Sequence, residues 1–313
     1  MPRRLRQPES NFKRIGEFFM AVQEYEFWFV VGTQFLYGED IFETINSHAG
    51  EMCAEWSKKM PCRIVAKPCV KTSKEILDLF RAANADDRCA GVITWMHTFS
   101  PSKAWIAGFN ALQKPYLHVN TQYNRDIPWQ DIDMDFMNLN QSAHGDREHG
   151  YIAARMRLRR KVIAGYWKDE TFQKKMETWI RAAVGAAESK KVHVLRISDN
   201  MRNVAVTDGD KVEAQIKHGW QVDHYGVGDI IREVEAVTEE EIDAQMAEYE
   251  KHYIMDTENI EAVRYQAREE VAIKKFMDRY AFNAFHTNFE DLQGLRQLPG
   301  LAAQDLMRQG YGF

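Results

Sequence analysis

The stretch YEFWFVVG, residues 25–32, decides the fold class. It is rich in aromatic and β-branched side chains and ends at a glycine, which is typical of a buried strand. Residues 39–60 follow with apolar side chains three or four positions apart, the spacing of one helix face. Strands that alternate with helices predict βαβ units and a parallel sheet. The alternation continues with strand patterns at 63–66, 91–97 and 116–120 and helix patterns at 72–85 and 100–112.

The second half of the chain repeats this alternation after a hinge-like segment at residues 189–191. We therefore expect an N-terminal α/β domain at residues 23–190 and a central α/β domain at 191–313. Each should hold a mostly parallel, Rossmann-like or flavodoxin-like sheet. The supporting patterns are an acidic loop at 126–140, helices at 142–158, 172–188, 211–219, 239–253, 260–280 and 302–309, and strands at 162–167, 192–197, 221–225 and 283–289.

The composition indicates a globular protein. The 313 residues are 45% hydrophobic and 28% charged, with a net charge of −5, so nothing favours nucleic acid as a partner. No stretch approaches the ~18 uninterrupted apolar residues of a membrane helix, so we expect no membrane partner. The four cysteines form no CxxC pair, and we expect free, buried thiols in a reducing cytoplasm. They are Cys53, Cys62, Cys69 and Cys89.

Residues 1–22 are expected to be an N-terminal extension outside the first domain. Residues 1–14 carry five basic side chains, and the apolar run at 15–22 is interrupted by Glu17 and too short for a secretory signal. Met20 lies just before the first strand and suits an alternative start of the chain.

Polar residues gather at the ends of the predicted strands, at 32–34, 97–98 and 120–122, where parallel sheets bind ligands. The densest polar cluster, at 138–149, contains His144 and Glu148 four positions apart. A metal pair, a proton relay and a surface ion pair all fit that spacing. The nucleotide fingerprints GxGxxG and GxxxxGK[ST] are absent. Two hypotheses follow: an enzyme that acts on a sugar, or a two-lobed sugar-binding protein without catalytic residues.

Several long strings of the sequence resemble L-arabinose isomerase, and the resemblance runs from about residue 25 to residue 313. It implies interconversion of L-arabinose and L-ribulose, and of D-galactose and D-tagatose, through an enediol with Mn²⁺ and two glutamates. It also implies homotrimers that pair into hexamers. The strings are WFVVGTQFLYG (28–38), WMHTFSP (95–101), MDFMNLNQ (134–141), DNMR (199–202), VAVTDGDKV (204–212), FEDL (289–292) and LPGL (298–301).

The chain departs from this family where it ends, at GYGF, residues 310–313. The family's two glutamates and two metal-ligand histidines come later, so that set and the family's third, C-terminal β domain are expected to be absent here. The resemblance implies that this chain keeps the residues that form one sugar-facing wall of the site. Its substrate-binding residues would be Gln34, Leu36, Tyr37, Gln141, His144, Met201 and Phe289.

Three readings are consistent with this departure: a short enzyme with a substitute metal site, an inactive remnant that binds sugar or a partner subunit, and a fragment of a longer isomerase. Family activity makes an intramolecular oxidoreductase the first expectation, although no catalytic residue is assigned by the sequence. The candidates for catalysis are His144 and Glu148. The candidates for the substitute metal site are His144, Glu148 and His149, with Asp146 in reserve.

Overall fold

The computed structural model describes residues 24–313, and contacts divide this part of the chain into two compact units. Their boundary falls between Ala187 and Glu188, inside helix α7 (Glu170–Ser189), where the sequence predicted a boundary at residues 190 and 191. The expected extension at residues 1–22, with its basic start and Met20, lies outside the described residues.

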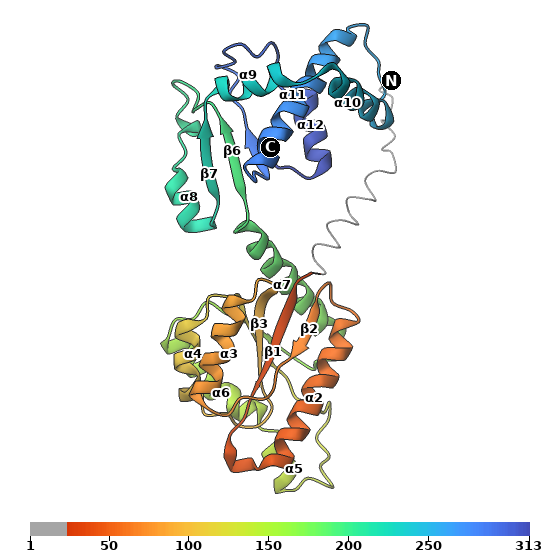
Figure 1. Cartoon of the computed structure of the whole chain (residues 1–313). Coiled ribbons are helices and arrows are strands. Elements are labelled where there is room, and N and C mark those ends of the chain that lie inside the picture. Colours follow the sequence, from red (N-terminus) through yellow and green to blue (C-terminus); the bar gives the residue numbers. More distant parts are fainter. Residues whose placement is uncertain (1–23) are drawn as a thin grey trace. The chain divides into compact units, whose positions relative to one another are not determined.

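The first unit is built on a five-stranded, all-parallel sheet (Figure 1). The strand order β2-β1-β3-β4-β5 is the flavodoxin-like, doubly wound order. The central strand places Ile93 opposite Phe29 on one side and opposite Leu117 on the other, which confirms the buried strand predicted at 91–97. The strands are β1 (Glu26–Gly32), β2 (Arg63–Ala66), β3 (Cys89–Met96), β4 (Tyr116–Asn120) and β5 (Lys161–Ala164).

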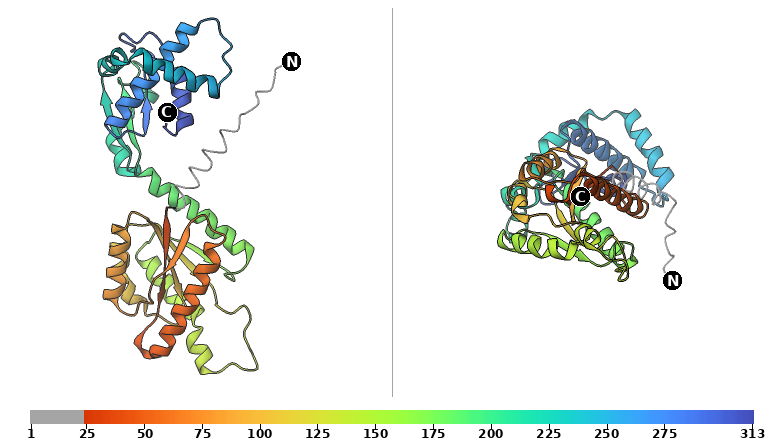
Figure 2. Two further views of the ribbon diagram at one scale, coloured as in Figure 1. Left: turned by 45° about the vertical axis from the view of Figure 1, so that its right-hand side comes forward. Right: turned by 90° about the horizontal axis from the view of Figure 1, so that it is seen from below.

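Helices cover both faces of this sheet because both faces of its strands are apolar. Phe27, Phe29 and Val31 of β1 pack in one core with α2 and α7, whereas Trp28 and Val30 pack in a second core with α3, η2 and α4. The left view of Figure 2 shows α2 and α3 on opposite sides of the sheet. The remaining bounds are α2 (Glu39–Ser57), α3 (Ser73–Ala85), η2 (Ser102–Trp105), α4 (Ile106–Ala111) and α6 (Ser142–Arg155).

Capping side chains set several helix starts. The Thr72 hydroxyl accepts from the Glu75 backbone N–H at 3.2 Å, which confirms the predicted cap of α3. The acidic segment 126–140 was predicted as a loop, but it contains a short helix, α5 (Met134–Leu139). Its cap is Asp133, whose carboxylate accepts from the Phe136 N–H at 2.8 Å. The segment therefore ends in a turn of helix just before the polar cluster.

The second unit holds a smaller parallel sheet, ordered β7-β6-β8. Helix α9 was not predicted. Gly226 precedes it and Gly228 lies in its first turn, and glycine has a low helix propensity. The strands are β6 (His193–Ile197), β7 (Gln221–Tyr225) and β8 (Ala284–His286). The helices are α8 (Lys211–His218), α9 (Val227–Ala236), α10 (Glu239–His252), α11 (Ile260–Arg279) and α12 (Gly300–Gln309).

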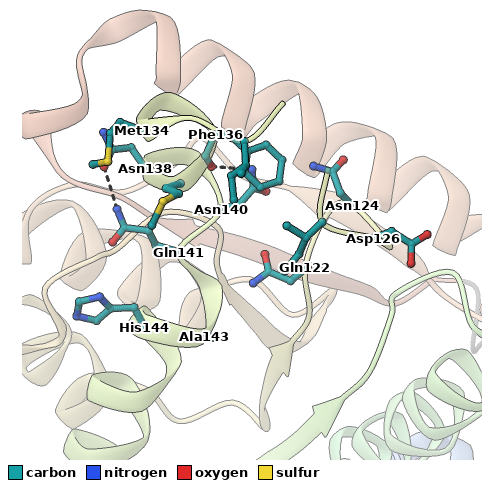
Figure 3. A pocket seen from close by; sticks show the side chains of 13 residues that line it. Gln122, Asn124, Asp126, Met134, Phe136, Asn138, Asn140, Gln141, Ala143 and His144 are labelled. Atoms are coloured by element: carbon teal, nitrogen blue, oxygen red, sulfur yellow. Dashed lines mark hydrogen bonds between the residues drawn. The ribbon is translucent and has the colours of Figure 1, made fainter. Parts of the chain in front are cut away.

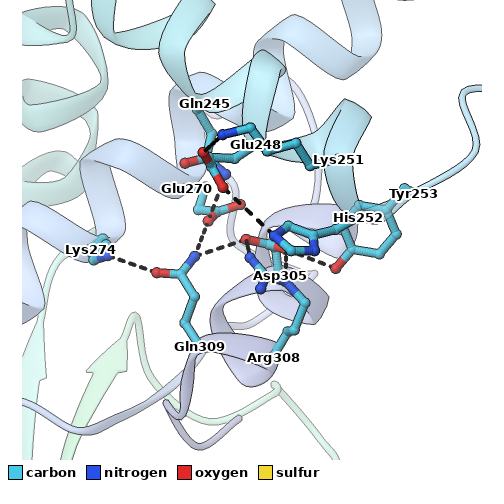
Figure 4. Close-up of polar contacts among 10 residues, drawn as sticks. All are labelled: Gln245, Glu248, Lys251, His252, Tyr253, Glu270, Lys274, Asp305, Arg308 and Gln309. Carbon is cyan, nitrogen blue, oxygen red and sulfur yellow. Dashed lines mark hydrogen bonds and ion pairs between the residues drawn. The ribbon is translucent and has the colours of Figure 1, made fainter. Parts of the chain in front are cut away.

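A buried pair of carboxyl groups joins α10, α11 and α12 (Figure 4). Glu270 and Asp305 are both fully buried and share a hydrogen bond. Burial raises the pKa of Glu270 to about 8. Burial also acts to raise the pKa of Asp305, but hydrogen bonds from Arg308 and Gln309, among others, outweigh it and lower that pKa to about 2. At neutral pH the shared proton therefore resides on Glu270, which donates to the ionised Asp305.

All four cysteines are buried and none forms a disulfide, as predicted. Burial raises the pKa of the Cys53 thiol to about 12, so this thiol is protonated and unreactive at neutral pH. Among the described helices, none is long and apolar enough to cross a membrane.

Candidate functional site

A pocket of about 410 Å³ lies at the carboxyl edge of the five-stranded sheet (Figure 3). Its walls come from the loop that follows β4, from α5 and from the first turn of α6. This is the edge at which the sequence predicted ligand binding. The lining residues are Gln122, Asn124, Asp126, Ile127, Ile132, Met134, Phe136, Met137, Asn138, Asn140, Gln141, Ala143 and His144.

The polar part of the lining consists mainly of carboxamides. Gln141 Nε2 donates to Asn138 Oδ1 at 3.3 Å, and Asn140 Nδ2 donates to the Phe136 carbonyl at 3.0 Å, so these amides are oriented by their neighbours. Among the described residues of the lining there is one carboxylate, Asp126, and no Lys or Arg. Carboxamides both donate and accept, and apolar side chains alternate with them, which suits the hydroxyls and C–H faces of a neutral polyol.

The first turn of α6 is fixed closely against β3. The Gln141 backbone N–H donates to the His97 carbonyl at 2.9 Å. One turn later, a Cβ on Gly145 would lie 2.9 Å from Met96 Cβ, so only glycine permits this approach. His144 projects from the same turn with its ring centroid 4.8 Å from that of Phe99. The backbone thus places Gln141 and His144 at the pocket.

A stack of rings lies beside the carboxyl end of β3. His48 Nδ1 is 2.8 Å from His97 Nε2, and the Tyr123 ring stacks on His48 with centroids 3.6 Å apart. Burial lowers the pKa of His97 to about 3, so this imidazole is neutral at pH 7 and forms a neutral hydrogen bond with His48. The Tyr123 hydroxyl donates to Glu51 at 2.5 Å, which lowers the pKa of that carboxylate. His97 was predicted as a strand-end residue, whereas His48 and Tyr123 were not predicted. His48 lies on α2, which only the folded chain brings to this edge, and Tyr123 lies one residue beyond the polar strand end at 120–122.

The predicted sugar-binding residues are divided between the two units. Gln141 and His144 line the pocket, whereas Gln34, Leu36 and Tyr37 lie at the end of β1, the last two in the short helix η1 (Phe35–Tyr37), outside that lining. The other two predicted residues belong to the second unit.

Met201 and Phe289 are described within the second unit alone. The Met201 backbone N–H donates to Thr207 Oγ1 at 3.2 Å, next to η3 (Ala205–Thr207). Phe289 is 59% exposed and lines a second pocket of about 560 Å³ with Leu298 and Phe313.

The candidates for catalysis and metal binding point in different directions. Glu148 Oε2 accepts from the Ser102 backbone N–H at 3.0 Å and so caps η2 instead of pairing with His144. His149 is buried with its Nε2 2.6 Å from the Tyr116 hydroxyl, and Asp146 Oδ1 lies 2.7 Å from His118 Nε2. Within residues 24–313, no three His, Cys, Asp or Glu side chains are arranged to hold a metal ion. The predicted substitute site of His144, Glu148 and His149, with Asp146, is therefore not assembled.

The fold and the pocket define the class: a protein of two α/β units, each with a parallel sheet, and a pocket lined mainly by carboxamides at the carboxyl edge of the first sheet. Comparison with known families makes this specific. Residues 21–191 match the L-arabinose isomerase N-terminal domain, and residues 193–313 match the L-arabinose isomerase central domain. The chain belongs to the L-arabinose isomerase family, which confirms the resemblance of its sequence strings.

Curated relatives agree with this assignment. The chain is 53% identical over 291 residues to L-arabinose isomerase from Shouchella clausii, a match that covers 93% of this chain and 60% of the relative. It is 50% identical over 301 residues to the enzyme from Bacillus subtilis, covering 94% of this chain and 61% of the relative. For the enzyme from Thermotoga maritima the identity is 50% over 296 residues, with coverage of 93% and 60%. The chain thus spans about 60% of the length of these relatives.

Proposed function

We propose that this chain forms a sugar-binding wall of an L-arabinose isomerase, the enzyme that interconverts L-arabinose and L-ribulose. The observation that carries the proposal is the pocket at the carboxyl edge of the first sheet, whose polar lining is mainly carboxamide. D-Galactose, which presents the same kinds of groups with one more carbon, is the second expected substrate.

In this proposal the residues of the chain bind and orient the sugar. Gln141 and Asn138 are already hydrogen-bonded to each other, so their remaining donors and acceptors are held ready for two hydroxyls. The apolar side chains of Met134 and Phe136 contact the C–H face of the sugar and exclude water from it. Orientation of this kind lowers the entropic part of a reaction barrier.

The expected cofactor, Mn²⁺, does not fit the described residues. A hard divalent cation needs several oxygen or imidazole ligands that converge on one point. The described residues provide no such group, and the candidates His144, Glu148 and His149 are directed apart. We therefore assign no step of the reaction to a metal held by these side chains.

Calorimetric titration with L-arabitol, an unreactive polyol, tests the proposal. Gln141→Ala and Asn138→Ala should each weaken binding about tenfold, since each loses hydrogen bonds worth about 1.4 kcal/mol in total. Asn110→Ala is the matched control, because Asn110 is an exposed amide in α4 that does not line the pocket. Equal affinities for all four proteins would reject the pocket as the sugar site.

A second function, sugar binding without turnover, is favoured by the lack of a metal-binding group in the described part of the chain. A measurement of L-arabinose turnover with added Mn²⁺ or Co²⁺ distinguishes isomerase activity from binding alone. Turnover that survives in His144→Ala would show that His144 is not a metal ligand. Arabitol binding with no turnover would establish the binding function.

We also propose that the chain assembles as a homotrimer or as a hexamer of two trimers. Four large apolar side chains near the carboxyl edge of the first sheet are strongly exposed, which is typical of a surface that another subunit covers. They are Phe35 (65%), Leu36 (81%), Trp129 (77%) and Met134 (65%).

A further inference from the structure

A line of polar side chains is buried between α6 and the sheet, next to the pocket. Ser142, Asp146 and His149 lie four and seven positions apart on α6, so they share one face of the helix. They are 1%, 8% and 1% exposed. A helix face packed on a sheet is usually apolar, so this stripe requires a specific explanation.

The stripe meets polar groups of β3 and β4 in a continuous chain of hydrogen bonds. His149 Nε2 is 2.6 Å from the Tyr116 hydroxyl, which is 2.9 Å from Thr94 Oγ1. Thr94 Oγ1 is also 2.9 Å from His118 Nδ1, and His118 Nε2 is 2.7 Å from Asp146 Oδ1. We call these five residues the buried chain.

The number of protons fixes the direction of every bond in the buried chain. When Asp146 is ionised and His118 is neutral, Asp146 only accepts, so His118 Nε2 donates to it and His118 Nδ1 accepts from the Thr94 hydroxyl. A hydroxyl has one proton, so Thr94 accepts from Tyr116, and Tyr116 accepts from His149 Nε2–H. His149 is then neutral, with its proton on Nε2.

One added proton on the Asp146–His118 pair reverses the three bonds that run from His118 Nδ1 through Thr94 and Tyr116 to His149. Whether it resides on Asp146 or on His118, His118 Nδ1 becomes a donor to Thr94, Thr94 donates to Tyr116, and Tyr116 donates to His149 Nε2. His149 must then carry its proton on Nδ1. No hydrogen bond of the buried chain is lost in either direction.

We propose that Asp146 positions the Gln141–His144 wall of the pocket through this buried chain, which exists in two directions that differ by one proton. This proposal rests on the proposed sugar site. Asp146 and His118 join the middle of α6 to β4, and the same helix carries Gln141 and His144 one turn earlier. In residues 24–313, Asp146 Oδ2, Ser142 Oγ and His149 Nδ1 have no partner, which leaves room for hydrogen bonds that change with direction.

The surroundings of His149 favour its neutral form. Burial lowers the pKa of His149 well below its usual range, and the nearby charges of His118 and Arg160 lower it further. Burial raises the pKa of Asp146, opposed by its hydrogen bond to His118. The other groups packed against His149 are the apolar rings of Trp105 and Phe109.

Nitrogen-15 NMR of histidine-labelled protein tests the two directions without any sugar. Lowering the pH from 8 to the lowest value at which the protein stays folded should move the His149 proton from Nε2 to Nδ1, with no imidazolium formed at His149. The signal is assigned by its loss in His149→Gln. A His149 that keeps one tautomer throughout, or that becomes an imidazolium, would overturn the two-direction chain.

Arabitol titration tests the positioning role. Asp146→Ala should weaken binding about tenfold, because α6 loses its hydrogen bond to His118 and the Gln141–His144 wall is no longer held in place. Asp146→Asn keeps the shape of the side chain and should retain most of the affinity while abolishing proton uptake at residue 146. The control is Asp78→Ala, which removes a surface partner of Lys74 on α3.

The outcomes distinguish this proposal from the proposed function. If wild-type protein binds arabitol and Asp146→Ala, with its far-ultraviolet circular dichroism unchanged, binds equally well, the positioning role is wrong and the sugar site stands. If wild-type protein does not bind arabitol, the sugar site itself fails, and the NMR result still decides whether the buried chain has two directions.

Discussion

Two glycines of α6 show how a single residue sets the position of the pocket wall. Gly145 lies so close to β3 that a methyl group there would overlap Met96, whereas a methyl group on Gly150 would meet nothing within 4 Å. A glycine-to-alanine substitution should therefore have different effects on stability at these two positions of α6.

Gly145→Ala should destabilise the protein by about 1–3 kcal/mol, because α6 must move away from β3 to admit the methyl group. Gly150→Ala should instead stabilise it by about 0.5–1 kcal/mol through the higher helix propensity of alanine. Urea denaturation followed by circular dichroism measures both. Equal effects of the two substitutions would contradict the close packing of α6.

The candidate site shows which residues a sequence can identify. Gln122 was indicated by the end of the strand predicted at 116–120, because strand ends of a parallel sheet meet at one edge. Gln141 was indicated by the polar cluster at 138–149 and by the family resemblance. Glu148 and His149 were misjudged because spacing on a helix shows which residues share a face but not what that face contacts. Their actual contacts, with Ser102 and Tyr116, come from other elements.

At the scale of elements, the buried Glu270–Asp305 pair makes the α10–α11–α12 layer sensitive to pH. The folded-state pKa of Glu270 is about 8, above its usual 4.5. The stability it contributes is therefore fully present below pH 4.5 and is lost as the pH rises through about 8. Burial raises the pKa of Glu269 to about 8 as well, so that carboxyl acts in the same direction.

We expect the free energy of unfolding of the wild type, relative to that of Glu270→Gln, to fall between pH 5 and pH 8.5. The comparison cancels the opposite contribution of His97, whose lowered pKa makes stability rise with pH. The lowered pKa of Asp305, about 2, affects stability only in more acidic solution. Urea titrations of both proteins at the two pH values provide the comparison. The surface variant Glu248→Gln, which removes an exposed partner of Lys251, is the control. A difference between the wild type and Glu270→Gln that stays constant or grows across this range would refute the assignment of the shared proton.

Regular elements were the most predictable part of the fold. The strands at residues 63–66, 116–120 and 221–225 agree with the structure at both ends. The first two are short, mainly apolar stretches, and the third alternates polar and apolar side chains, which is typical of a half-buried strand. The segment 100–112 was less regular than its sequence suggests: it begins as the 3₁₀ helix η2 and continues as α4. The loop that follows β4 has no periodicity, so the pocket that it forms with α5 is visible only in the folded chain.

At the scale of the whole molecule, exposed apolar side chains predict self-association. Trp129 and Leu36 are 77% and 81% exposed, and burying such side chains against another subunit removes several hundred Å² of apolar surface from water. Light scattering should give the mass of a trimer or hexamer of the 36.5 kDa chain. Trp129→Ser with Leu36→Ser should shift the mass toward the monomer. A wild-type monomer at high concentration would reject the assembly.

We propose that the carboxyl edge of the five-stranded sheet binds the sugar. A crystal structure of the protein with L-arabitol tests it most directly. We predict arabitol between the amides of Gln141, Asn138 and Gln122, with its carbon chain against Phe136. The proposed sugar site would be wrong if arabitol were bound elsewhere, for instance in the pocket beside Phe289, while the amide pocket held only water.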